Sequence, residues 1–169
     1  REAMDRKYVM ITGASSGVGK DATQYLNSLG YGIVLVARNE KKLKQTLDTL
    51  EGDNYIISYD LNDLYNIESI FKQCSDNGMK LYGLVHAAGE ADLIPIRVAN
   101  MQDVNRSLNV NANSFLELAR IFGKKKYSVD GSRIVVLSSI EAVLCEKGHA
   151  IYAGSKNLLE TYAKIYAKE

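Results

Sequence analysis

The sequence of 169 residues contains no tryptophan, one proline and only two cysteines, Cys74 and Cys145. No apolar run approaches the roughly 18 residues that a membrane-spanning helix needs, and the N-terminus lacks the apolar stretch of a signal peptide. The two cysteines lack the short spacing of a metal or redox pair, which indicates small buried residues in a reducing compartment and favours a cytoplasmic protein without membrane contact. Neither His86 nor His149 has a cysteine or carboxylate neighbour at ligand spacing, so we expect no metal site.

The charge of the chain gives no sign of a nucleic-acid partner, because the formal net charge is +1 and the basic residues are dispersed. The one basic cluster, Lys124-Lys125-Lys126, follows a glycine at an expected helix end, where cations suit the macrodipole. We therefore expect no nucleic-acid partner. Residues 1–3, which precede the first methionine, we interpret as a cloning or processing remnant.

Short apolar runs alternate with segments of helical periodicity along the whole chain. The expected strands are 7–13, 31–38, 55–60, 81–89 and 133–139, and the expected helices are 18–30, 40–52, 63–74, about 101–122 and about 150–168. Strict strand–helix alternation predicts the α/β class. We expect a Rossmann-type doubly wound parallel sheet of five strands in the order 3-2-1-4-5, with helices on both faces, in a single domain over residues 1–169.

The turn between the first strand and the first helix is rich in glycine, and residues 12–19 read TGASSGVG. Glycines allow a tight turn and a close backbone approach to a pyrophosphate, and the helix N-terminus behind them offers free N–H groups. A glycine-rich turn without a ligand is the alternative. Its place after the first strand favours nucleotide binding.

Tyr152 and Lys156 are four residues apart, so a helix places them on one face. By itself this pair fits an ordinary surface contact. Together with TGASSGVG, however, the Tyr-x-x-x-Lys pattern resembles the short-chain dehydrogenase/reductase family, in an NADP-preferring form. For the glycine motif, the resemblance implies that the cofactor contacts Gly13, Ser15, Ser16, Gly17, Val18 and Gly19.

Other positions match the family in the right order along the chain. Asp60-Leu61 is similar to the acidic position that contacts adenine, and His86-Ala87-Ala88-Gly89 occupies the place of the family's Asn-Asn-Ala-Gly, with histidine replacing the first asparagine. Asn111 best matches the asparagine of the fourth helix, with Asn109 and Asn113 as alternatives. Ser139, thirteen residues before Tyr152, falls at the catalytic serine, with Ser138 as the adjacent alternative. The resemblance implies cofactor contacts for Asp60, Leu61, Ala87, Ala88, Gly89, Tyr152 and Lys156.

The resemblance implies hydride transfer between a nicotinamide and a carbonyl or secondary alcohol, with one proton handled by the protein. Tyr152 would give or take that proton, and the Lys156 ammonium would stabilise the phenolate and hold the nicotinamide ribose. Ser139 would orient the substrate oxygen, and Asn111 would position a water that links Lys156 to solvent. His149 we interpret as a solvated loop residue, with a place at the substrate rim as the alternative.

Cofactor choice depends on the end of the second strand, where an acidic residue suits a ribose hydroxyl and an arginine suits a 2′-phosphate. Here Ala37 stands where an acid would discriminate for NAD, and Arg38 follows it. Because arginine forms bidentate contacts with phosphate, we expect NADP(H) rather than NAD(H). Ser15 or Ser16 would add a hydroxyl.

The family's domain normally continues beyond the Tyr-x-x-x-Lys helix, so we interpret the chain as a fragment or a shortened form. A catalytically silent nucleotide-binding module is the alternative to an oxidoreductase. We expect a homo-oligomer, either a dimer or a tetramer. The resemblance implies it, since members of the family usually associate through helices, and the last helix carries an apolar stripe. The stripe comprises Leu158, Leu159, Tyr162, Ile165 and Tyr166.

Overall fold

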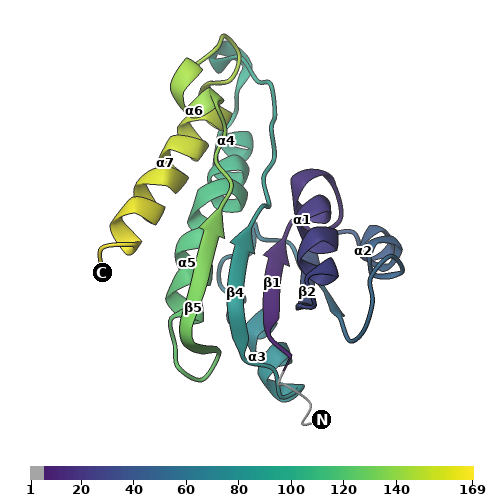
Figure 1. Cartoon of the computed structure of the whole chain (residues 1–169). Coiled ribbons are helices and arrows are strands. Elements are labelled where there is room, and N and C mark those ends of the chain that lie inside the picture. Colours follow the sequence, from purple (N-terminus) through teal and green to yellow (C-terminus); the bar gives the residue numbers. More distant parts are fainter. Residues whose placement is uncertain (1–5) are drawn as a thin grey trace, which may run out of the picture.

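The computed structural model describes residues 6–169 (Figure 1), so the expected remnant at 1–3 lies outside the described part. Five strands form one sheet: β1 (Tyr8–Thr12), β2 (Gly32–Ala37), β3 (Tyr55–Ser58), β4 (Leu81–His86) and β5 (Ser128–Val136). Their order is β3-β2-β1-β4-β5, and all neighbouring pairs are parallel. The predicted Rossmann-type topology is confirmed.

Helices connect the strands in the expected alternation. They are α1 (Gly17–Ser28), α2 (Glu40–Leu47), α3 (Glu68–Asp76), the 3-10 turn η1 (Ile96–Val98), α4 (Met101–Leu108), the π-helical turn η2 (Asn109–Asn113), α5 (Ser114–Phe122), α6 (Glu141–Leu144) and α7 (Ala150–Tyr166). The expected helix 101–122 is therefore continuous but contains a π-helical turn. Among residues 6–169, no helix has both the length and the apolar character that a bilayer crossing demands.

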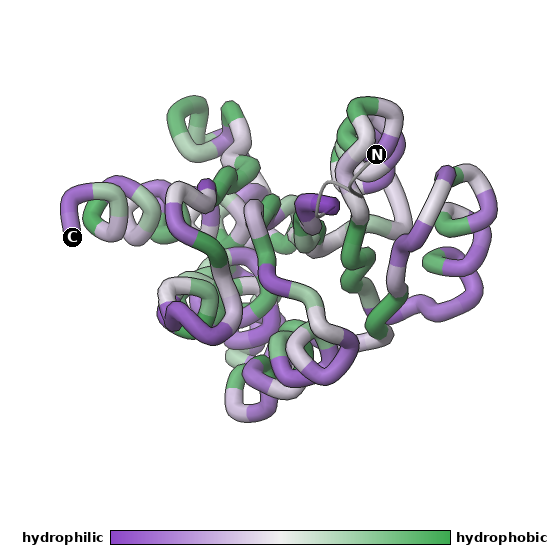
Figure 2. The backbone as a smooth tube through the Cα atoms, turned by 60° about the horizontal axis from the view of Figure 1, so that its bottom comes forward, coloured by the Kyte–Doolittle hydropathy of each residue, from purple (hydrophilic) through white to green (hydrophobic). Residues whose placement is uncertain are grey.

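Alternating strand residues divide the core into two layers. On one face of the sheet, Met10 and Val36 pack with Phe71 of α3 and Leu118 of α5. On the other face, the intervening strand residues pack against helices α1 and α2. Helix α7 adds a third cluster, in which the fully buried Leu159 packs against α5 and β5. Extended segments near the centre of Figure 2 accordingly include strongly hydrophobic stretches.

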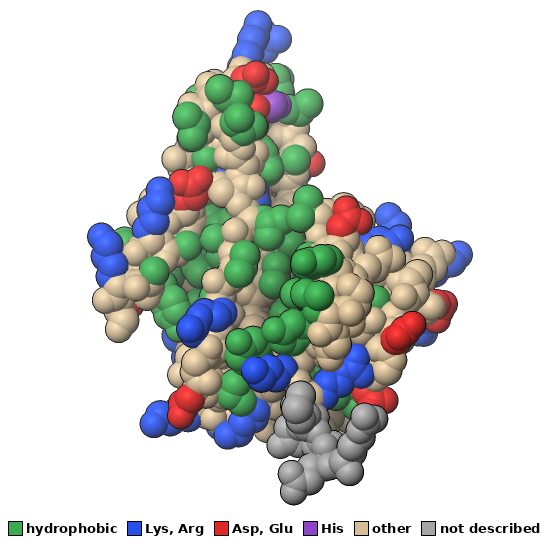
Figure 3. All heavy atoms as spheres, viewed as in Figure 1, with side chains coloured by type: hydrophobic (Ala, Val, Ile, Leu, Met, Phe, Trp, Pro, Cys, Tyr) green, Lys and Arg blue, Asp and Glu red, His purple; other side chains and the backbone are tan. Residues whose placement is uncertain are grey.

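The face that carries α1 and α2 is covered unevenly. Val135 of β5 lies in register with Val85 of β4 and Ile11 of β1, so all three share this face. Ile11 is fully buried, whereas Val135 is 53% exposed. Hydrophobic side chains gather in the middle of this face, beside α1 (Figure 3).

Parallel register brings the carboxyl ends of four strands to one edge of the sheet. Thr12 is paired with both Val36 and His86, and His86 with Val136. The loops after β1, β2, β4 and β5 therefore meet at this edge, where open α/β sheets bind their ligands.

Three local expectations are wrong. The helix expected at 63–74 begins at Glu68, because the Asp60 and Asp63 carboxylates accept nearby backbone N–H groups and hold tight turns before it. Strand β5 ends at Val136, so the two candidate serines lie in the loop beyond it. Cys145 is exposed rather than buried, with a left-handed φ of 51° after the short helix α6, whereas Cys74 is buried as expected.

Candidate cofactor cleft and active site

The turn after β1 needs its glycines. Gly13 and Gly17 have positive φ angles of 71° and 51°. A Cβ atom on Gly13 would lie 2.8 Å from the backbone nitrogen of Ala88, and one on Gly19 would collide with the carbonyl oxygen of Gly13. Gly13 thus packs against the loop after β4, and neither it nor Gly19 has room for a side chain.

The N-terminus of α1 behind this turn has no protein cap. Ser16 is the N-cap residue, yet its side chain makes no capping hydrogen bond, and the first turn holds no acidic residue. Helices α2 and α4, by contrast, are capped by Asn39 and Asn100. The first N–H groups of α1 and the hydroxyl of Ser16 are therefore free of capping contacts, an arrangement that suits an anion.

A cleft of about 480 Å³ runs along the edge of the sheet from this turn. Eight of the predicted cofactor residues line it: Gly13, Ser15, Ser16, Arg38, Asp60, Leu61, Ala88 and Gly89. Ala37, which stands where an acid would favour NAD, lines it as well. The predicted contacts Gly17, Val18, Gly19, Ala87, Tyr152 and Lys156 are not among its lining residues. The lining also includes Val36, Asn39, Lys42, Tyr59, Glu90 and Val110, which sequence reasoning missed.

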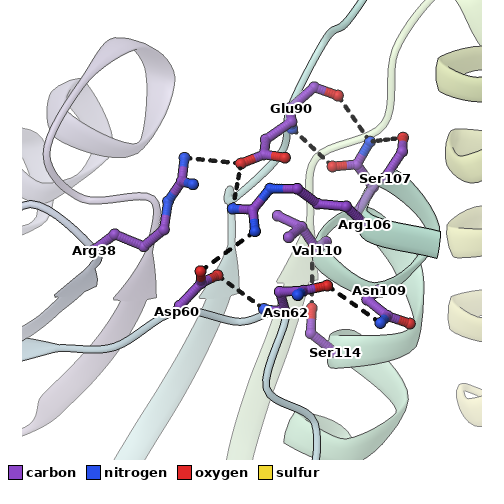
Figure 4. A network of polar contacts seen from close by, with 10 residues as sticks. Arg38, Asp60, Asn62, Glu90, Arg106, Ser107, Asn109, Val110 and Ser114 are labelled. Atoms are coloured by element: carbon purple, nitrogen blue, oxygen red, sulfur yellow. Dashed lines mark hydrogen bonds and ion pairs between the residues drawn. The ribbon is translucent and has the colours of Figure 1, made fainter. Parts of the chain in front are cut away.

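Four charged side chains, here called the cleft network, join the walls of this cleft (Figure 4). Glu90 Oε1 lies 2.8 Å from Arg38 Nη2 and 2.9 Å from Arg106 Nη2. Arg106 Nη1 lies 3.4 Å from Asp60 Oδ2. The hydrogen bond to Glu90 is the main cause of a raised pKa of Arg106, which thus stays charged. Glu90 and Arg106 belong to none of the matched motifs. Glu90 directly follows the matched Gly89, whereas no sequence signal points to Arg106.

Asn111 lies at the centre of the π-helical turn and is fully buried. Its Oδ1 accepts the backbone N–H of Glu90 at 2.7 Å, and its Nδ2 donates to the carbonyl of Glu90 at 3.0 Å. Nδ2 also lies 2.8 Å from Ser155 Oγ on α7. Asn111 thus ties the loop after β4 to two helices. π-Helical turns occur frequently at functional sites.

The alternative asparagines are placed differently. Asn109 donates to Asn62 at 3.3 Å in an exposed contact, and Asn113 donates to Asn109 and accepts from Tyr162. Of the three, only Asn111 contacts the loop that contains Gly89 and Glu90.

Lys156 is 4% exposed although it carries an ammonium group. Its Nζ donates to the carbonyl of Leu137 at 2.9 Å and lies 5.8 Å from the ring centroid of Tyr152. Burial lowers the pKa of Lys156. A Cβ atom on Gly89 would lie 3.2 Å from this Nζ, so the ammonium closely approaches a residue that lines the cleft. The predicted helical pairing of Tyr152 and Lys156 is thus present, and the described residues give the tyrosine hydroxyl no hydrogen-bond partner.

The two candidate serines point to different partners. Ser138 is exposed and donates to Glu160 Oε1 of α7 at 2.6 Å. Ser139 is half-buried, and its Oγ accepts the backbone N–H of Glu141 at 3.2 Å, which leaves its hydroxyl hydrogen available.

His86 is buried at the end of β4. Its Nδ1 lies 2.9 Å from Thr12 Oγ1, which also accepts the N–H of Ala88 at 3.2 Å. Its Nε2 has no hydrogen-bond partner in the described chain. Burial, with a smaller contribution from the charge of Lys156, lowers the pKa of His86 to about 4, so the ring is neutral near pH 7. We refer to Thr12, His86, Asn111, Ser155 and Lys156 as the buried cluster.

The expectation that His149 is a solvated loop residue is wrong. Its side chain is only 19% exposed, and its Nδ1 lies 2.7 Å from Glu141 Oε2. Glu146 comes close as well, so that one potential ligand atom of each of the three residues lies within 4.8 Å of the others. Carboxylates do therefore neighbour His149 in space. This close contact with His149 is the main cause of a lowered pKa of Glu141.

Comparison with known proteins agrees with this geometry. The family profile described as short chain dehydrogenase matches residues 7–169. The chain is 28% identical to a very-long-chain 3-oxoacyl-CoA reductase of Candida glabrata, covering 96% of this chain and 52% of that protein. It is 33% identical to the 3-oxoacyl-acyl-carrier-protein reductase FabG of Rickettsia typhi, covering 89% of this chain and 61% of the relative. The chain thus spans little more than half the length of these two relatives.

Among solved structures, a short chain dehydrogenase of Shigella flexneri in complex with NADP superposes with a TM-score of 0.86 at 25% identity, covering 97% of this chain and 71% of that one. Sequence and fold lead to the same conclusion: the chain belongs to the short chain dehydrogenase family.

Proposed function

We propose that this chain holds the cofactor-binding and catalytic residues of an NADP(H)-dependent oxidoreductase, acting on a carbonyl or secondary alcohol. The single observation that carries the proposal is the place of Lys156. Its buried ammonium lies beside the Tyr152 ring and against Gly89, which lines the cleft. One ammonium group is thereby in reach of both the proposed proton donor, Tyr152, and the cofactor cleft.

The residues of the cleft fit a dinucleotide. The uncapped start of α1 and the glycine turn suit the pyrophosphate, and Arg38 suits a 2′-phosphate. The complex of the Shigella flexneri relative with NADP supports the same cofactor class. A bound nicotinamide would supply or accept the hydride, and the chain's own residues would handle the proton.

In this mechanism Tyr152 transfers the proton. Its hydroxyl gives the proton to a carbonyl oxygen in reduction and removes it from an alcohol in oxidation. Lys156 stabilises the phenolate form by its charge, and the hydroxyl of Ser139 donates to the same substrate oxygen. Both polar atoms of Asn111 are engaged by the protein, so we propose that it positions Glu90 and α7. Its predicted role in holding a water remains a prediction.

The family's pairing habit still supports the predicted homo-oligomer, but most of the stripe on α7 packs within the chain. Leu159 is fully buried, Leu158, Tyr162 and Tyr166 contact the same cluster, and only Ile165 is largely exposed, at 51%. The small-molecule substrate and the cytoplasmic location also remain predictions.

Replacement of Tyr152 by phenylalanine tests the mechanism, because it removes only the proton-carrying oxygen. We expect NADPH oxidation with a panel of ketones and aldehydes to slow by about 10²–10⁴-fold or more, with cofactor binding nearly unchanged. Tyr162→Phe, on the same helix, is the matched control and should stay near the wild-type rate. Cofactor binding without turnover in the wild type would instead identify a catalytically silent nucleotide-binding module.

A further inference from the structure

Glu90 directly follows Gly89 and places a carboxylate inside the cleft. The side chain is only 15% exposed, and its Oε1 serves two guanidinium groups at once. Arg38 reaches it from the end of β2, and Arg106 from α4 (Figure 4). The Glu90 carboxylate therefore links Arg38, which lines the cleft, to Arg106, which lies outside its lining.

Two arginines that share one oxygen form a site for an anion. Without the carboxylate, the two guanidinium groups would lie close together with no charge between them, and their repulsion would favour an anion that enters. Arginine is well suited to phosphate because its planar group offers paired donors. Glu90 thus occupies a position that a phosphate oxygen could take.

The backbone and the side chain of Glu90 are held by different partners. Asn111 holds both the N–H and the carbonyl of Glu90, at 2.7 and 3.0 Å. Within residues 6–169 the carboxylate, in contrast, is held by the side chains of two arginines alone, and Arg38 is 55% exposed. The acid can therefore turn away from Arg38 by side-chain rotation alone, while its backbone stays in place.

We propose that Glu90 is an internal competitor for Arg38 that sets the affinity of the cleft for a 2′-phosphorylated nucleotide. In the free chain the carboxylate holds Arg38, and the incoming phosphate must displace it. Arg106 then retains the released carboxylate, with Asp60 beside it, and so acts as a positioning residue. This inference rests on the proposed role of Arg38 in NADP binding.

The test is calorimetric titration of the full chain with NADP⁺ and NAD⁺. Glu90→Gln removes the charge and keeps the shape, so NADP⁺ should bind about two- to fivefold more tightly, as expected for loss of one partly exposed ion pair. NAD⁺ affinity should not change. Glu117→Gln is the matched control, since it breaks the Glu117–Arg120 pair on α5 outside the cleft lining and should alter neither affinity.

The Arg38→Ala variant distinguishes failure of the competition by Glu90 from failure of the proposed preference for NADP(H). Alone, it should weaken NADP⁺ selectively, and in its background Glu90→Gln should have no further effect on NADP⁺. A selective loss in Arg38→Ala combined with unchanged or weaker NADP⁺ binding in Glu90→Gln would overturn the competition and leave the cofactor preference standing. A non-selective effect of Arg38→Ala would overturn the cofactor preference itself. Equal tightening of both nucleotides in Glu90→Gln would also refute competition.

A measurement on the unchanged chain covers the case in which Glu90→Gln does not fold. The side-chain carboxyl carbon signal of Glu90, followed by NMR, should shift when NADP⁺ is added and much less with NAD⁺. Identical shifts with both nucleotides would contradict displacement by the phosphate.

Discussion

The buried cluster and the cleft network meet at Glu90, and they are built in opposite ways. Asn111 and Ser155 have no exposed surface, and Lys156 has 4%. In the cleft network, the side chains of Arg38, Asp60 and Arg106 are between 32% and 55% exposed. The backbone of Glu90 belongs to the first region and its carboxylate to the second.

This difference in burial separates fixed geometry from exchangeable contacts. A buried polar group that loses its partner bears a desolvation cost of about 1–3 kcal/mol, because no water replaces the bond. An exposed ion pair contributes about 0–1 kcal/mol, since water and salt replace it readily. The buried cluster is therefore suited to fixed geometry, and the cleft network to yielding to a charged ligand.

The largest effect on stability should come from Asn111→Ala. It leaves the N–H and carbonyl of Glu90 without their partners and empties a closed site, so we expect a loss of about 2–4 kcal/mol in the free energy of unfolding. Asn109→Ala, two residues away in an exposed contact, should cost less than about 1 kcal/mol. Urea unfolding of both variants measures the difference, and equal losses would erase the distinction between the two regions.

His86 should make the buried cluster sensitive to acid. Its folded-state pKa is lowered to about 4, whereas an unfolded histidine titrates near 6.5. As the pH falls, the unfolded chain binds the proton first, so stability is fully present above about pH 6.5 and declines towards about pH 4. His86→Asn cannot titrate and should show a flatter profile of unfolding free energy in this window. Parallel profiles for the two proteins would exclude His86 as the source.

Arg106→Gln should have a smaller effect, because its partners are partly exposed. We expect a loss of less than about 1 kcal/mol in unfolding free energy, measured by urea titration. A loss as large as that of Asn111→Ala would show that the cleft network also holds the fold together.

Added salt should produce the smallest change in stability, and it should affect the cleft network but not the buried cluster. At about 1 M ionic strength the screening length falls to about 3 Å, so the difference between wild type and Arg106→Gln should shrink towards zero. The effect of Asn111→Ala should persist, because it is a buried and uncharged contact. Thermal unfolding at low and high salt provides the measurement.

Periodicity and motif spacing predicted the strand order, the glycine turn and the pairing of Tyr152 with Lys156. These features depend on local sequence and on the rules of parallel sheets, which fix where strand ends meet. The family resemblance favoured Asn111 over its neighbours. The structure buries Asn111 among three contacting segments, and its catalytic role stays a prediction.

The missed features depend on side-chain directions between distant segments. Glu90 meets Arg38 across 52 positions of sequence, and no spacing rule encodes that contact. From the sequence His149 is expected to be a solvated loop residue, yet helix α6 brings Glu141 to it. Cys145 follows the same short helix, whose four residues are too few to reveal a period.

The π-helical turn has a consequence for the rotational phase of the whole helical rod from Met101 to Phe122. Each residue of an α-helix advances the side-chain direction by about 100°. Asn111 faces Glu90, whereas Phe115 and Leu118 of α5 are buried in the core. Removing a single residue between 109 and 113 would rotate α5 by about 100° relative to α4. The buried face of α5 could then pack on the core only if Asn111 no longer faced Glu90. A one-residue deletion there should therefore damage the protein more than most substitutions, although no side chain need change its chemistry.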